Sequence, residues 1–77
     1  MEEREIWRLR PGDRVVVTAF TDGSYPGTVW QVCYSPYSFR PVVQVVLDEP
    51  PAGTPRLQSI SAQFVEMADV EEKTEAG

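Results

Sequence analysis

Among the residue types that most often carry chemistry, this chain of 77 residues has one cysteine and twelve carboxylates but no histidine. Histidine is the usual general base, the most common metal ligand and a member of the standard catalytic triads. The single cysteine, Cys33, cannot form an internal disulfide or a structural zinc site of the Cys/His type. The sequence also has no glycine-rich phosphate loop of either standard spacing. We therefore predict no catalytic residue, no metal site and no cofactor.

The remaining reactive groups have simple structural interpretations. Cys33 lies in an apolar run without a basic neighbour in sequence, which favours a buried structural thiol. Two carboxylate pairs, Asp48 with Glu49 and Asp13 with Asp22, lie among proline and glycine residues, where solvated loop charges are expected. Asp13 is expected to hydrogen-bond the backbone of the turn before the first strand.

Aromatic residues are the strongest functional signal, because eight of them exceed what a core this small can bury. Some should therefore be exposed or lie at an interface, where Tyr and Trp are enriched. Trp7 and Tyr25 are distant from the main cluster in sequence. We predict a surface that binds a protein partner or further copies of the chain, formed by Trp30, Tyr34, Tyr37, Phe39 and Arg40. The alternative is that these aromatics only cover the ends of the fold.

Strand signals dominate the chain. Runs rich in β-branched and aromatic residues predict strands at residues 14–20, 27–34, 41–47 and 56–61. Glycine and proline clusters between these runs predict turns. The best helical candidate, residues 61–67, predicts one short turn capped by Ser61 and then a last short strand at residues 65–67. A small sheet of this kind is expected to close into a barrel, because an open one would expose its edges.

The charge distribution separates a body from a tail. The formal net charge is −5, and residues 68–77 contain four acidic residues and one lysine. The predicted organisation is an N-terminal arm (residues 1–8), a barrel (9–67) and a flexible acidic tail (68–77). The body has few basic residues, so strong nucleic-acid binding is not expected. Without a membrane-spanning apolar run or a signal peptide, the chain is predicted to be cytoplasmic and not bound to a membrane.

Residues 9–17, followed by residues 25–29, resemble the opening hairpin of SH3-like barrels. The shared pattern is Gly-Asp-x-Val-x-Val, a loop, and Gly-x-Val. Gly12 would turn the chain into the first strand, and Gly27 would allow the second strand to bend. The resemblance covers roughly residues 9–67 and implies an all-β, five-stranded SH3-like small barrel with a disordered acidic C-terminal tail. This fold carries many unrelated functions, so the resemblance does not choose among them.

More distant resemblances imply alternative functions. Residues 57–60, Leu-Gln-Ser-Ile, are similar in position to the Val-Gln-Ile-Tyr strand of type II (plasmid-type) dihydrofolate reductases, NADPH enzymes that form a tetramer around a pore. That resemblance would place Gln58 and Ile60 at a pore, although only Gln58 keeps the identity of the motif.

KOW and Tudor-like modules share the hairpin and imply a nucleic-acid-associated barrel. Residues 12–18 and 40–43 look similar to strands of two small photosynthetic barrels, one from photosystem I and the other the variable chain of ferredoxin–thioredoxin reductase. Docking to ferredoxin would need a basic face, which this body lacks. The principal prediction is a non-enzymatic protein-interaction module.

Overall fold

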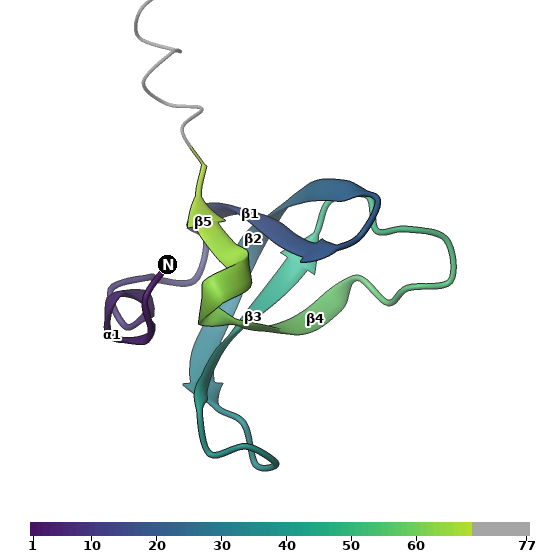
Figure 1. Ribbon diagram of the computed structural model, residues 1–77. Helices are drawn as coiled ribbons and strands as arrows, with labels where there is room; N and C mark the ends of the chain where they lie inside the picture. Colours follow the sequence, from purple (N-terminus) through teal and green to yellow (C-terminus); the bar gives the residue numbers. More distant parts are fainter. Residues whose placement is uncertain (69–77) are drawn as a thin grey trace, which may run out of the picture.

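The computed structural model describes residues 1–68, and these residues form a mostly β structure (Figure 1). In chain order the elements are α1 (Glu3–Ile6), β1 (Arg14–Phe20), β2 (Gly23–Tyr34), β3 (Pro41–Leu47), β4 (Leu57–Ser61), the 3-10 helix η1 (Ala62–Phe64) and β5 (Val65–Met67). The strands of this region form one antiparallel sheet in the order β4-β3-β2-β1-β5. The predicted all-β class is confirmed, whereas closure into a barrel and the SH3-like resemblance stay predictions.

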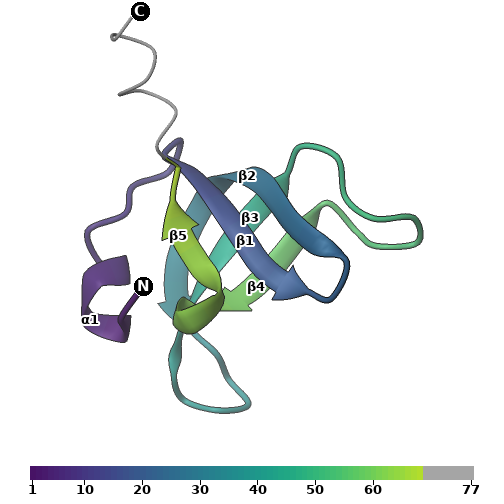
Figure 2. The ribbon, with the colours of Figure 1, turned by 45° about the horizontal axis from the view of Figure 1, so that its top comes forward.

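The sheet is strongly curled, and η1 connects its two outer strands, β4 and β5 (Figure 2). β1 and β3 have the predicted bounds, and β4 begins one residue later than predicted. β2 begins at Gly23, not at Gly27, because the turn after β1 is tighter than expected and Phe20 already pairs with Gly23. The Tyr25 ring packs edge-on against Phe20 with 5.1 Å between ring centroids, which stabilises this hairpin.

The long strand β2 pairs with two neighbours, with β1 through its first part and with β3 through its second. Gly27 is paired on both sides, because it lies opposite Val15 of β1 and Leu47 of β3. A Cβ atom at Gly27 would lie 2.5 Å from Cγ1 of Val45 and 2.8 Å from the carbonyl oxygen of Val46. Only a residue without a side chain permits this close approach of the two strands, whereas the bend predicted at Gly27 stays a prediction. A bulge in β2 follows at Trp30, one extra residue between the paired residues Val29 and Gln31.

The N-terminal segment contains a helical turn that the sequence pattern did not predict. The N–H of Glu2 donates to Oε1 of Glu5 at 3.0 Å, which supports the first turn of α1. Ile6 at the end of α1 is fully buried, and Leu9 is buried with it in the main core. The segment predicted as an arm thus covers part of the sheet. A four-residue helix is too short to show a hydrophobic period, which explains why the pattern was not visible.

The core consists of aliphatic side chains from every strand. None of the eight aromatic residues belongs to the buried set, and only Phe20 and Tyr25 pack partly against it. Because the curled sheet encloses little space, β-branched residues fill it and the larger rings lie outside. The buried cluster is Ile6, Leu9, Val15, Val17, Val29, Val43, Val45, Leu47, Ile60, Ala62 and Val65.

The predicted turn after β4 is confirmed as η1, and the predicted last strand is confirmed as β5. The predicted capping role of Ser61 is wrong, because its side chain makes no capping hydrogen bond. Burial of Ala62 anchors the turn instead. Ala68 is buried, and its N–H donates to the carbonyl oxygen of Arg14 at 3.2 Å. The rest of the predicted acidic tail, residues 69–77, lies outside the described residues.

A charged clamp joins β1 to the end of β3. Nη1 of Arg14 donates to Oδ1 of Asp48 at 3.0 Å and to Oγ1 of Thr28 at 2.7 Å. The hydrogen bond from Arg14 lowers the pKa of Asp48 below its ordinary value of 3.8. Both side chains stay nearly half exposed, at 47% and 42%, so the pair is a modest and salt-sensitive contribution to stability.

We predict that Gly27→Ala lowers the free energy of unfolding by about 2 kcal/mol, because the new methyl group forces β2 and β3 apart. Urea denaturation followed by tryptophan fluorescence would measure the loss. Ser24→Ala, at an exposed position of the same strand, is the matched control and should change stability by less than about 0.5 kcal/mol. Equal stability of the two variants would contradict the role given to Gly27.

A second prediction concerns pH. Because the pKa of Asp48 is lower in the folded state, the clamp stabilises the protein above the ordinary carboxyl pKa and loses this effect as pH falls through the folded-state value. Asp48→Asn should therefore cost less than about 1 kcal/mol at neutral pH. The difference from the parent chain should shrink in acid and in high salt, which urea denaturation at several pH values would measure. A difference that is constant with pH would show that Asp48 acts through packing.

Candidate functional site

The most exposed aromatic residues lie at the end of the β2–β3 hairpin, which extends away from the rest of the sheet (Figure 1). We call its loop, residues 35–40, the hairpin tip. Ser35 organises the loop: its N–H donates to the carbonyl oxygen of Arg40 at 2.8 Å, and its own carbonyl oxygen accepts the N–H of Phe39 at 2.9 Å. Oγ of Ser35 also accepts the N–H of Tyr37 at 3.2 Å. The tip is therefore a defined loop that holds Tyr37, 94% exposed, in solvent.

Phe39 has a backbone conformation that its side chain disfavours. Its φ of 58° lies in the left-handed region, where glycine or asparagine is usual and a bulky residue is an outlier. The conformation costs roughly 1–2 kcal/mol. The ring is 81% exposed, so packing within the chain returns little of that cost. Glycine at this position would avoid the strain and make the folded chain more stable.

Tyr34 lies where the hairpin joins the sheet and contacts Trp7, the residue that follows α1. Their ring centroids are 5.2 Å apart, with the planes tilted by 48°. Tyr34 lies opposite Pro41, on the same face as the half-buried Val32 and the buried Val43, so it stands at the rim of the core face. Trp7 was not among the predicted site residues. Trp7 and Tyr34 are far apart in sequence, so no sequence pattern relates them. Only the packing of α1 against the sheet brings the two rings together.

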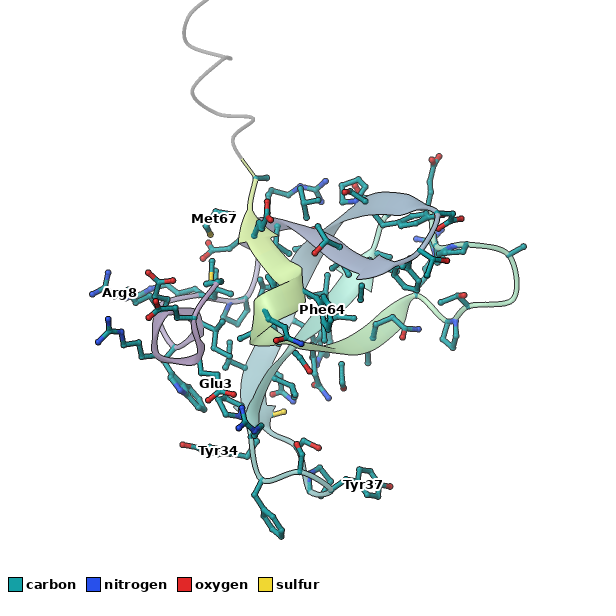
Figure 3. All side chains as sticks on the ribbon, in the orientation of Figure 1. Glu3, Arg8, Tyr34, Tyr37, Phe64 and Met67 are labelled. Atoms are coloured by element: carbon teal, nitrogen blue, oxygen red, sulfur yellow. The ribbon has the colours of Figure 1, made fainter. Side chains whose placement is uncertain are left out.

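Arg40 is held at the base of the tip by Glu3 of α1, with 2.8 Å between Nη1 and Oε2. The two side chains are 72% and 45% exposed, so the pair contributes little stability. Its effect is geometric, because it links α1 to the hairpin on the side where Trp7 and Tyr34 meet. Figure 3 shows Tyr34 directed toward α1 and Tyr37 directed to the opposite side of the hairpin. We define the tip surface as the exposed aromatic residues on both sides of this end of the hairpin together with Arg40, namely Trp7, Tyr34, Tyr37, Phe39 and Arg40.

Trp30 does not share a face with Tyr34. Its neighbour Val29 is buried in the core, and Trp30 is 58% exposed on the outer face of β2. The bulge at Trp30 then reverses the alternation along β2, so that Val32 and Tyr34 return to the core face. The predicted aromatic surface is thus divided into the tip surface and an isolated outer tryptophan.

The residues proposed for a reductase-like pore lie in β4. Ile60 is packed into the core, where it is 5% exposed. Gln58 is half-buried, and its Nε2 donates to the carbonyl oxygen of Pro55 at 2.8 Å. The two residues are on the same inward face, and the burial of Ile60 leaves it no access to a pore.

The other reactive groups have local roles. Oδ2 of Asp13 accepts the N–H of Arg10 at 2.9 Å, which confirms its predicted role in the turn before β1. Oδ2 of Asp22 accepts the hydroxyl of Tyr25 at 2.8 Å, and this hydrogen bond raises the pKa of Tyr25. Cys33 is half-buried, less than predicted. Within residues 1–68, His, Cys, Asp and Glu form no group of three that could hold a metal ion.

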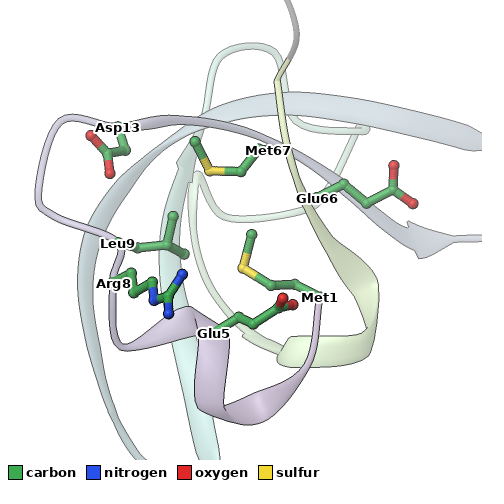
Figure 4. Close-up of a pocket in the computed structure, with 7 residues that line it drawn as sticks. All are labelled: Met1, Glu5, Arg8, Leu9, Asp13, Glu66 and Met67. Atoms are coloured by element: carbon green, nitrogen blue, oxygen red, sulfur yellow. The ribbon is translucent and has the colours of Figure 1, made fainter.

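An open hollow of about 500 Å³ lies between the N-terminal segment and β5. Figure 4 shows Met1, Leu9 and Met67 facing it, with Asp13 and Glu66 on opposite sides. Glu5 and Arg8 complete its lining. These lining residues include none of the described aromatic side chains, so the hollow is separate from the tip surface.

Comparison with protein-family models, with curated proteins and with solved structures finds no match to this chain. Its function is therefore inferred from the geometry of the described residues. The helices within residues 1–68 lack the length and apolar character needed to cross a membrane.

The strain at the tip leads to a stability prediction. Phe39→Gly should leave the protein more stable than Tyr37→Gly by about 1 kcal/mol, because only the first variant relieves a left-handed conformation. Both variants remove an exposed ring and both add the flexibility of glycine, so Tyr37→Gly is the matched control. Urea denaturation of the two variants measures the difference. A less stable Phe39→Gly would mean that the Phe39 ring packs against the hairpin in solution.

Proposed function

We propose that this chain is a non-enzymatic interaction module that binds a protein partner through the tip surface. The observation that carries the proposal is Phe39, an exposed ring kept at a backbone conformation that only glycine adopts without cost. Strain of this kind persists where it serves a function more often than where it serves the fold. Contact with a partner would bury the ring. This burial would offset the free-energy cost of the left-handed backbone, which packing within the chain does not offset.

The chemistry of the tip surface supports this proposal. Trp, Tyr and Arg are the residues that most often dominate binding energy at protein interfaces, and the tip surface contains Trp7, Tyr34 and Arg40. The hydrogen bonds of Ser35 fix the backbone of the loop that carries Tyr37 and Phe39, and the Glu3–Arg40 pair holds the Arg40 side chain. A surface organised in advance loses less conformational entropy when it binds.

The composition of the tip also indicates the polarity of the partner surface. Residues 35–39 carry no charged side chain, and Arg40 is paired with Glu3. A matching partner surface is apolar or aromatic, with few charges of its own. Binding is therefore expected to change little with salt concentration, unlike binding to nucleic acid.

The other candidate functions gain no specific support. A reductase-like pore would need Ile60 at the surface, and Ile60 belongs to the core. Of the arginines in residues 1–68, Arg4, Arg14 and Arg40 are paired with carboxylates, which weakens them as phosphate contacts.

Site-specific photo-crosslinking tests the proposal. With p-benzoylphenylalanine in place of Tyr37, the chain expressed in its own cells should form a discrete adduct with one partner protein. The same group in place of Ser24, exposed at the opposite end of β2, should not form this adduct. A second change, Phe39→Ser, should remove the adduct, whereas Trp30→Ala should leave it. The far-UV circular dichroism spectrum should be unchanged in each case.

Two outcomes would contradict the proposal. One is an equal yield of the adduct from positions 37 and 24, which would indicate that the crosslinks come from random collisions and not from a binding surface. The other is an adduct that survives Phe39→Ser but is lost in Trp30→Ala, which would move the binding surface to the outer face of β2.

A further inference from the structure

The two outer strands of the sheet differ in how they are protected against pairing with another chain. β5 is three residues long and has Glu66 at its centre. β4 is five residues long, Leu-Gln-Ser-Ile-Ser, without a charge or a proline, and its pairing with β3 has no bulge. Charges, prolines, bulges and short length are the features that usually protect an edge strand. β4 lacks all of them, and Figure 1 shows it at the margin of the sheet.

The hydrogen-bonding pattern indicates which backbone groups of β4 face outward. The N–H of Leu47 donates to the carbonyl oxygen of Arg56 at 2.8 Å. Because main-chain groups alternate in direction along an antiparallel strand, those of Gln58 and Ile60 face β3. The main-chain groups of Leu57 and Ser59 and the N–H of Ser61 point away from the sheet, and the side chains of all three residues are exposed.

These outward groups form a self-complementary edge. When two copies of β4 pair antiparallel about Ser59, Ser59 faces Ser59 and Leu57 faces Ser61 of the second copy. No like charges meet in this register. The same operation on β5 would set Glu66 against Glu66. The chain carries a net charge of −5, so two copies repel one another least along this uncharged strand.

We propose that β4 is a self-association edge, at which a second copy of this chain adds its own β4 in antiparallel orientation and continues the sheet. The pairing is isologous, so it closes at two copies and does not propagate into a filament. One strand pair buries a small area, and the dimer is therefore weak and exchanges rapidly. This edge is distinct from the tip surface, and the inference does not depend on the proposed function.

The first test measures the mass of the full chain by light scattering across a concentration series. The parent chain should change from monomer to dimer as concentration rises. Ser59→Lys places two like charges at the centre of the pairing and should weaken the dimer at least about tenfold. Ser24→Lys makes the same charge change at an exposed site in β2 and should leave the dimer intact. Tyr37→Ala should also leave it intact.

The second test keeps the proposal falsifiable if Ser59→Lys fails to fold. Hydrogen exchange of the unmodified chain should slow at the amides of Leu57, Ser59 and Ser61 as concentration rises. Exchange at Gln58 and Ile60, which bond to β3, should be slow at every concentration. A monomer at all concentrations overturns the proposal, as does exchange that is independent of concentration. A dimer that Ser59→Lys leaves intact, or that Tyr37→Ala removes, also overturns it.

Discussion

The fold depends on one steric constraint, the close approach of β2 and β3 at Gly27. Because position 27 has no side chain, β2 can approach β3 closely at the point where its pairing with β1 overlaps its pairing with β3. One continuous strand thus belongs to both halves of a curled sheet. Curling brings Val15, Val29 and Val45 toward a common interior, where buried aliphatic surface supplies most of the stability.

The same constraint accounts for the position of the aromatic residues. A strongly curled sheet of short strands encloses a narrow core, which valine, isoleucine and leucine fill without gaps. Rings of the size of Trp30 or Tyr37 find no space there and lie outside it. Exposure of aromatic side chains is therefore a consequence of the fold. What requires a further explanation is Phe39, where the backbone is strained to present the ring.

Exposed charged pairs position segments more than they stabilise them. The Arg14–Asp48 clamp connects the start of β1 with the end of β3, and the Arg40–Glu3 pair connects the hairpin with α1. Each pair is accessible to solvent and to salt, so each is energetically modest. Of the two, the Arg40–Glu3 pair joins the elements that carry the candidate surface. The edge of β4 has no comparable charges, and this contrast makes it the natural place for a second copy to pair.

Local composition was enough to predict the strands and turns, apart from the start of β2, and the small final turn and strand. Valine runs favour pleated, half-buried backbone and glycine or proline interrupts it, and both effects act over a few residues. Long-range packing was needed for the contact between Trp7 and Tyr34, the burial of Ile6 and the separation of Trp30 from Tyr34. The first two depend on a helical turn too short to show a period. The third depends on a single bulge, because one extra residue in a strand of period two moves every later side chain to the opposite face.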